Sequence, residues 1–161
     1  MNAGKQRWTF ISYSRKDKDF ALQLGRELKS AGFLVWLDQL DIATGTRWDD
    51  AVERALRECE IFLIILTPAS TSSENVKDEI GYAIDHGKRI LPVLLEEGDV
   101  PLRLRRFQYV DFTKMDFSDG VERAKQLLEN LLNERSIPVS PTNPKLEVQT
   151  PPKTRAFRVF C

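Results

Sequence analysis

Short apolar segments alternate with longer amphipathic segments along most of this chain. Runs rich in β-branched and aromatic residues, each bounded by polar or turn residues, predict strands over Trp8–Tyr13, Phe33–Leu37, Ile61–Leu66, Ile90–Leu95 and Phe107–Phe112. Several of these runs are apolar almost without interruption, as strands are when a sheet is covered on both faces. We therefore expect a sheet buried between two layers of helices.

Between the strands, apolar residues recur every three or four positions, which is the spacing of one helix face. This pattern predicts helices over Asp17–Ser30, Arg47–Glu58, Ser72–His86 and Phe117–Asn133. The stretch Glu96–Arg106 is too short and too polar to predict a helix. Strands that alternate with helices favour right-handed crossovers, so the sequence predicts an α/β fold with a doubly wound parallel sheet.

The third predicted helix carries two glutamates for which we expect different roles. Glu74 follows Thr71 by three positions, the spacing of a capping box, so we expect its side chain to bond a free backbone N–H at the helix start. Glu79 lies at the edge of an apolar stripe that contains Val76 and Ile80. The residues alone favour a surface carboxylate paired with a neighbouring charge, and a catalytic carboxylate is the alternative.

Composition narrows the classes of function. The 161 residues suit one domain, and 24 basic residues balance 24 acidic ones, so nothing favours a nucleic-acid or membrane partner. Cys59, Cys161 and the only histidine, His86, lack the spacing of metal ligands, so we expect neither metal nor cofactor. The first residues lack the long apolar core of a signal peptide, and no apolar run approaches the ~20 residues that span a bilayer, so we expect a soluble, cytoplasmic protein.

The last part of the chain has a different composition. Five of the eight prolines follow residue 134, in a stretch with little apolar periodicity. We therefore predict a folded domain over residues 1–135 and a proline-rich linker over residues 136–161. Because the final RAFRVFC resumes an alternating apolar pattern and then stops, we expect this linker to lead toward a downstream domain.

Three segments, in order along the chain, resemble TIR (Toll/interleukin-receptor) domains of bacterial type. They are FISYSRKD (Phe10–Asp17), WLDQLDIATGTRW (Trp36–Trp48) and SENVKDEIGYAIDHGKRILPVLL (Ser73–Leu95). The resemblance implies a flavodoxin-like fold, with a five-stranded parallel sheet in the order 2-1-3-4-5 and helices on both faces. It also implies one of two activities, cleavage of NAD+ or catalytically silent assembly with other TIR domains, and the fold alone does not choose between them.

In that sheet order, a ligand crevice is expected at the carboxyl ends of the first and third strands, where the connections leave in opposite directions. The loop after the first strand offers hydroxyls and cations for phosphate or ribose, and the third strand leads to the helix that carries Glu79. The resemblance places the catalytic glutamate of NAD-cleaving TIR domains at Glu79. The residues that we expect to bind substrate are Ser12, Tyr13, Ser14, Arg15, Asp38 and Trp48.

The segment Asp38–Arg47 matches the BB loop of the family, which the resemblance implies gates the pocket and contacts other TIR domains. Its expected assembly residues are Leu40, Asp41, Ile42 and Gly45, and the glycine supplies backbone freedom. Turn capping is an equal alternative for Asp38, and helix packing is the alternative to ring stacking for Trp48. Trp36 alternates with apolar neighbours in a buried strand, so we expect it in the core rather than the pocket.

The resemblance leads to the hypothesis of a NAD+ nucleosidase that releases nicotinamide and ADP-ribose or a cyclic ADP-ribose. NAD+ is then a substrate rather than a cofactor, and other TIR domains are the expected partners, since self-assembly would activate the enzyme in bacterial anti-phage signalling. Several NAD-cleaving relatives carry an aromatic residue one turn before the glutamate, whereas this chain has Asn75 and Val76 there. A silent adaptor and a nucleoside deoxyribosyltransferase are the alternatives.

Overall fold

The structure is a computed structural model that describes residues 7–37 and 48–134. The chain divides into two units, Met1–Leu131 and Leu132–Cys161, and the fold below is that of the first unit. Its strands are β1 (Thr9–Ser12), β2 (Val35–Trp36), β3 (Ile61–Leu66), β4 (Arg89–Leu94) and β5 (Val110–Asp111). Its helices are η1 (Arg15–Asp17), α1 (Lys18–Ser30), α3 (Trp48–Glu58), α4 (Pro68–Ser72), α5 (Glu74–Asp85), η2 (Leu102–Leu104) and α6 (Phe117–Asn133), of which η1 and η2 are 3₁₀ helices.

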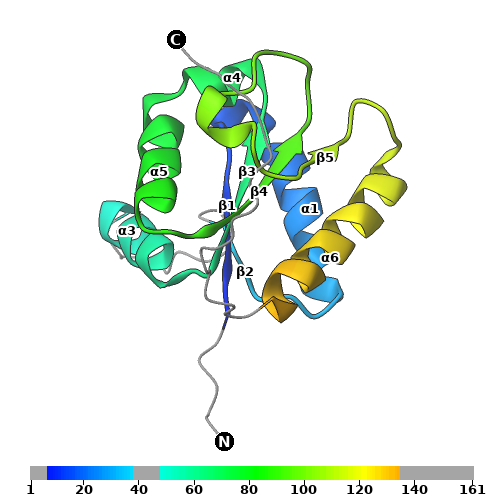
Figure 1. Cartoon of the computed structure of the whole chain (residues 1–161), viewed down its shortest axis with the longest axis horizontal. Coiled ribbons are helices and arrows are strands. Elements are labelled where there is room, and N and C mark those ends of the chain that lie inside the picture. Colours follow the sequence, from blue (N-terminus) through cyan, green and yellow to red (C-terminus); the bar gives the residue numbers. More distant parts are fainter. Residues whose placement is uncertain (1–6, 38–47, 135–161) are drawn as a thin grey trace, which may run out of the picture. The chain divides into compact units, whose positions relative to one another are not determined.

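The five strands form one parallel sheet in the order β2-β1-β3-β4-β5, which confirms the predicted order. Helices α3 and α5 cover one face of the sheet, and α1 and α6 cover the other (Figure 1). The chain leaves β1 toward β2 on one side and reaches β3 on the other side. The carboxyl ends of β1 and β3 therefore lie side by side at the point where the direction of winding reverses.

Alternation along the central strands divides the core between the two faces. All six residues of β3 are buried, and its Phe62 and Ile64 join Phe10 of β1 in a cluster with Leu56 of α3 and Ile80 of α5. Parallel ring stacking extends this cluster across three strands, with centroid distances of 5.1 Å from Trp36 to Phe10 and 5.8 Å from Phe10 to Phe62. The face toward α3 and α5 is thus closed by aromatic side chains from β2 to β3.

The predicted helix Ser72–His86 corresponds to α5, but a separate short helix that was not predicted, α4, ends at Ser72 just before it. Ser73 is extended, with φ −79° and ψ 125°, and its hydroxyl caps α5 by accepting a hydrogen bond from the backbone N–H of Val76. Two hydroxyl-containing caps in close succession, at Thr67 and at Ser73, start two separate helices instead of one. The observed break therefore follows from local side-chain hydrogen bonds that compete with helix continuation.

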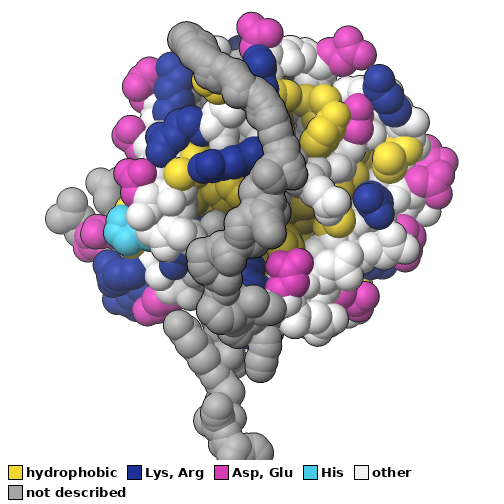
Figure 2. Space-filling view, in the orientation of Figure 1, with side chains coloured by type: hydrophobic (Ala, Val, Ile, Leu, Met, Phe, Trp, Pro, Cys, Tyr) yellow, Lys and Arg dark blue, Asp and Glu magenta, His cyan; other side chains and the backbone are white. Residues whose placement is uncertain are grey.

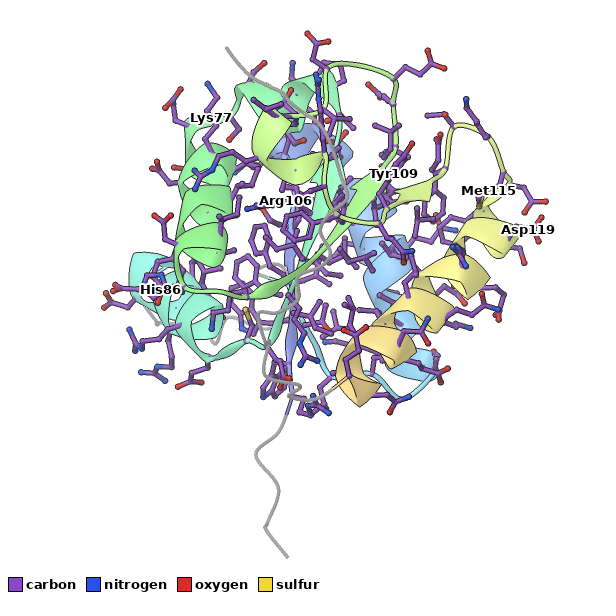
Figure 3. The ribbon with its side chains drawn as sticks, viewed as in Figure 1. Lys77, His86, Arg106, Tyr109, Met115 and Asp119 are labelled. Atoms are coloured by element: carbon purple, nitrogen blue, oxygen red, sulfur yellow. The ribbon has the colours of Figure 1, made fainter. Side chains whose placement is uncertain are left out.

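The predicted capping role of Glu74 is wrong. The capping box of this region joins Thr67 and Ser70, each side chain bonding the backbone N–H of the other residue at 3.0 Å. Glu74 is the first residue of α5, and its exposed carboxylate pairs with Lys77 at 3.3 Å. Figure 3 shows Lys77 near the start of α5 and His86 at its end.

The second half of the sheet is less regular than the sequence predicts. Strand β5 has only the two residues Val110 and Asp111, where a strand over Phe107–Phe112 was expected, and the stretch before it holds only the short η2.

In the described parts of the chain, no helix combines the length and the apolar character needed to cross a membrane. The predicted linker, residues 136–161, lies outside the described residues.

Gly120 gives a test of the packing between α6 and the sheet. A Cβ atom at this buried position would overlap the ring of Phe112, which already meets Phe20 edge to face with a centroid distance of 5.0 Å. We expect Gly120→Ala to lower the free energy of unfolding by about 1–3 kcal/mol, because an overpacked core forces side chains out of their preferred positions. Urea denaturation of the variant measures this loss.

Gly81 provides the matched control, since it lies inside α5 and a Cβ atom there would meet only the Arg103 guanidinium at 3.9 Å. Gly81→Ala is expected to raise the free energy of unfolding by about 0.5–1 kcal/mol through helix propensity. Equal effects of the two substitutions would contradict the packing assigned to Gly120.

Candidate active site

A cavity of about 320 Å³ opens at the carboxyl end of β1. Its walls come from β1 and the loop that follows it, from β2, and from α3 and α5, so it lies beside the reversal point of the sheet. The lining residues are Phe10, Ile11, Ser12, Tyr13, Ser14, Arg15, Lys16, Trp36, Val52, Ser73, Asn75, Val76 and Glu79. This volume lies at the small end of the range of about 300–1,000 Å³ that is usual for ligand pockets.

A hydrogen bond between β1 and α5 organises this cavity. The hydroxyl of Ser12, the last residue of β1, donates to Oε1 of Glu79 at a distance of 2.6 Å. Ser12 is buried and Glu79 is half-buried, so the bond holds the carboxylate at the wall of the cavity. Hydrogen bonds to a charged acceptor are short and stronger than neutral ones. The carboxylate is therefore a fixed negative charge that faces a partly enclosed space.

The helix itself explains where Glu79 lies. Val76, Ile80 and Ala83 form the buried stripe that packs α5 against the sheet. Glu79 stands next to this stripe, so the same packing that buries its neighbours brings its side chain to the edge of the sheet. Asn75 is one turn earlier on the helix and also lines the cavity, and its side chain is exposed.

The loop after β1 is fixed by a second hydrogen bond that joins the ends of β1 and β3. Ser14 caps η1 by accepting from the N–H of Lys16 at 3.2 Å, and Asp17 follows. The carboxylate of Asp17, a side chain that is 8% exposed, accepts a hydrogen bond of 2.6 Å from the hydroxyl of the buried Thr67. This bond ties the loop to the connection between β3 and α4.

Sequence reasoning missed this contact, because Asp17 was interpreted only as the start of a helix. The signal in the sequence that could have revealed this contact is the position of the two residues relative to the predicted strands. Asp17 follows the first strand, Thr67 follows the third, and the carboxyl ends of these strands meet in a sheet of this order. A buried hydroxyl and a buried carboxylate at the same edge need each other as partners.

The structure brings the predicted residues Ser12, Tyr13, Ser14 and Arg15 together with Glu79 around one cavity. Their roles in binding remain predictions. Trp48 begins α3, and its side chain is outside what the structure describes. The remaining predicted residues also lie outside the described residues, namely Asp38, Leu40, Asp41, Ile42 and Gly45.

Trp36 differs from the prediction, which placed it in the core alone. Its ring stacks on Phe10 with an interplanar angle of 12°, but the side chain is only half-buried and also lines the cavity. The reason is that β2 is the edge strand of the sheet. A side chain on an edge strand has a neighbour on one side only, so the ring serves both the core and the pocket.

Another cavity, also of about 320 Å³, is lined by the last residue of β3, by β4 and by the segments between β4 and β5. Its walls are Leu66, Pro92, Gly98, Asp99, Val100, Leu104, Arg105 and Tyr109. The Arg105 side chain is engaged by the carbonyl of Val100 at 3.0 Å. Apolar side chains gather near the middle of one face of the molecule (Figure 2), and Tyr109 is 51% exposed. Fewer polar groups converge here than around Glu79, so the Glu79 cavity is the better candidate for chemistry.

In the part of the chain that the structure describes, neither the thiol of Cys59 nor any cluster of metal-binding side chains forms a second reactive site. Burial raises the pKa of the Cys59 thiol to about 11, and the thiol donates to the carbonyl of Leu56 at 3.2 Å, so at neutral pH it is a packed, protonated side chain. Within residues 7–37 and 48–134, no three His, Cys, Asp or Glu side chains gather as metal ligands would. The Glu79 cavity thus offers one carboxylate, several hydroxyls and the cations Arg15 and Lys16.

Comparison with known proteins agrees with the fold described above. The family model described as "TIR domain" matches residues 9–128. The chain is 26% identical over 151 residues to the uncharacterized protein y4cD of Sinorhizobium fredii, covering 86% of this chain and 22% of that protein. It is 27% identical over 96 residues to the "Probable 2' cyclic ADP-D-ribose synthase BdTIR" of Brachypodium distachyon, covering 58% of this chain and 43% of that protein. The chain therefore spans less than half the length of either relative.

Solved structures show the same fold. The TIR domain of the Toll-related receptor TRR-2 from Hydra magnipapillata superposes with a TM-score of 0.66 at 19% identity. The match covers 78% of this chain and 98% of that domain. At 19% identity, this likeness shows a shared fold and nothing further.

The bond between Thr67 and Asp17 can be tested by removing the hydroxyl. Thr67→Val leaves a buried carboxylate without its donor and also removes the cap of α4, so we expect a loss of about 2–3 kcal/mol in the free energy of unfolding. Chemical denaturation monitored by circular dichroism measures the loss.

Thr67→Ser is the control, because it keeps the hydroxyl and removes only one buried methyl group. We expect it to cost about 1 kcal/mol or less. A serine variant as unstable as the valine variant would show that the methyl group, and not the hydrogen bond, holds this position.

Proposed function

The chain belongs to the TIR domain family, and on this premise we propose that it cleaves the bond between nicotinamide and ribose in NAD+. The observation that carries the proposal is the hydrogen bond that holds the Glu79 carboxylate at the wall of the cavity. The name of the Brachypodium relative, a probable cyclic ADP-ribose synthase, supports a substrate of this class.

The chemistry requires little more than a fixed negative charge. The bond between ribose C1′ and the nicotinamide ring nitrogen breaks, and both electrons go to the nitrogen, so the positively charged pyridinium leaves as a neutral molecule. C1′ becomes part of an oxocarbenium ion, whose positive charge a preorganised carboxylate stabilises. Because the leaving group needs no proton, Glu79 does not need the second carboxyl group that glycoside hydrolases use.

The second step determines the product. A water molecule that attacks C1′ and releases a proton gives ADP-ribose, whereas a hydroxyl or ring nitrogen of the same molecule gives a cyclic ADP-ribose. The Ser12 hydroxyl keeps Glu79 in place during both steps by its 2.6 Å hydrogen bond. The hydroxyls and cations of the loop after β1 would orient the ribose and the phosphates.

Assembly with other TIR domains is the second part of the proposal. In it, a neighbouring copy completes the cavity through its BB loop, and clustering switches on NAD+ cleavage as a cytoplasmic anti-phage response. The cavity supports this idea, because it opens at the edge strand β2, where the segment 38–47 begins. A neighbouring chain that borders the opening would shield the oxocarbenium ion from bulk solvent and leave room for the single water molecule or substrate group that attacks C1′.

Glu79→Gln tests the catalytic step, because the amide keeps the shape of the side chain and removes its charge. We expect nicotinamide release from NAD+ to fall at least about 100-fold, the scale seen when a transition-state contact is lost. Chromatographic quantification of nicotinamide gives the rate, and the products identify the second step.

Glu74→Gln is the matched control on the same helix, since Glu74 is exposed and pairs only with Lys77 at the surface. It is expected to retain full activity. Equal rates for wild type and Glu79→Gln would exclude Glu79 from catalysis.

The assembly step predicts a particular dependence on protein concentration. If a neighbouring copy completes the site, nicotinamide release per molecule should rise with concentration and should rise further with a crowding agent. A rate per molecule that stays constant over the whole range would exclude activation by assembly. No nicotinamide at any concentration would favour the silent adaptor instead.

A further inference from the structure

We propose that the open hollow beside the Glu79 cavity binds the adenosine half of the substrate, with the diphosphate held at Lys16 between the two spaces. This inference rests on the proposed function, since it assigns the rest of a dinucleotide whose nicotinamide end lies at Glu79. It adds a recognition site on the opposite side of the loop after β1.

This open hollow, which we call the second hollow, is not the cavity beside Tyr109. It has a volume of about 590 Å³ and lies at the carboxyl ends of β1, β3 and β4. Its lining residues are Ser14, Lys16, Asp17, Pro68, Ala69, Ser72, Ser73 and Glu96. Three of them, Ser14, Lys16 and Ser73, also line the Glu79 cavity. The two spaces therefore adjoin along one ridge, which is formed by these three residues.

The volumes match the two halves of a dinucleotide. At about 320 Å³, the Glu79 cavity is near the lower limit for a ligand pocket and suits one base with its ribose. NAD+ consists of two such halves joined by a diphosphate. A ligand with its nicotinamide riboside at Glu79 must continue out of the cavity, and the ridge leads from there to the second hollow.

The ridge carries the groups that bind phosphate. Lys16 is exposed, and no acidic side chain of the described residues pairs with it. Its ammonium group is a compact charge of the kind that binds phosphate in many proteins. The hydroxyls of Ser14 and Ser73 each accept a backbone N–H, from Lys16 and from Val76. A hydroxyl that accepts still has its own hydrogen to donate, and a phosphate oxygen is a suitable acceptor.

The position of the ridge is fixed. The next residue after Lys16, the buried Asp17, also lines the second hollow, and its carboxylate accepts the hydrogen bond from Thr67 that joins the ends of β1 and β3. Ser73 is equally restrained, because it is the cap of α5. Phosphate-binding groups that are held in place by such contacts lose little conformational entropy when a ligand binds.

The far side of the second hollow has the opposite charge. Glu96 follows β4, lines the hollow with an exposed side chain, and is anchored by a backbone bond of 3.4 Å to the carbonyl of Leu66. A carboxylate repels phosphate but accepts hydrogen bonds from the hydroxyls of a ribose, as acidic residues do in dinucleotide-binding folds. Lys16 and Glu96 thus give the ligand a direction, with the diphosphate at the ridge and the adenosine ribose beyond it.

Three substrates, each of which contains the one before it, distinguish the contacts made by the phosphates from those made by the adenosine half. Nicotinamide riboside lacks phosphate, nicotinamide mononucleotide adds one phosphate, and NAD+ adds the adenosine half. We expect Glu96→Gln to raise KM about tenfold for NAD+ and to leave KM for the other two unchanged. Lys16→Met should raise KM for NAD+ and for the mononucleotide and leave the riboside unchanged. Glu97→Gln is the control, since this exposed neighbour lines neither hollow and should change nothing.

A Glu96→Gln effect of equal size on all three substrates, or no effect on NAD+, would overturn the proposal. A binding measurement keeps the test independent of catalysis. ADP is titrated calorimetrically into protein carrying Glu79→Gln, with and without Glu96→Gln and with inorganic phosphate as a competitor. We expect Glu96→Gln to weaken ADP binding about tenfold without changing phosphate binding.

The two proposals fail in distinguishable ways. Absence of nicotinamide release from all three substrates by the wild type would reject the proposed cleavage, whereas ADP binding that depends on Glu96 would still support the second hollow as a nucleotide site. Two results of the ADP titration would overturn the inference. One is ADP binding that does not depend on Glu96. The other is ADP binding that inorganic phosphate abolishes completely, because the hollow would then be a general anion site.

Discussion

The site depends on the parallel pairing of β1 with β3, which runs from Thr9 and Ile61 to Ser12 and Ile64. This register places the end of β1 beside the middle of β3, so the chain that leaves β1 has the last residues of β3 and the start of α4 as neighbours. Two hydrogen bonds of the site follow from it, because Ser12 meets Glu79 of α5 and Asp17 meets Thr67. A register shift would separate both pairs and turn the side chains of β1 to the opposite face.

Short hydroxyl side chains connect the elements around this reversal point. Ser12 joins a strand to a helix, Thr67 joins two loops, and Ser73 ends one helix segment and begins another. Each of these hydrogen bonds is either local or joins the ends of neighbouring strands. Each gives a hydrogen-bond partner to a polar group that would otherwise have none. Side-chain hydrogen bonds therefore fix the positions of the elements at the polar end of the sheet.

Much of this arrangement is predictable from the sequence, for reasons that differ between regions. The run Ile61–Leu66 is apolar at every position and is buried at every position, so periodicity identified the central strand. The order of the strands came instead from the resemblance to TIR domains, and the structure confirms it. Periodicity does not specify side-chain hydrogen bonds, which is why the break at Ser73 and the contact of Asp17 with Thr67 were missed and why Glu74 was given the wrong cap. Trp36 was placed only in the core because its alternation with apolar neighbours was considered alone, although the expected order 2-1-3-4-5 already puts the second strand at the edge of the sheet.

The stacked rings of Trp36, Phe10 and Phe62 link the edge of the sheet to its centre. Strand β2 pairs with β1 through two positions, Val35 with Thr9 and Trp36 with Phe10, and the ring stacking contributes to its attachment. The same Trp36 ring forms part of the cavity wall. Attachment of the edge strand and occupancy of the cavity are therefore thermodynamically linked, and a molecule that gains affinity from this ring must, by the same amount, make β2 harder to detach.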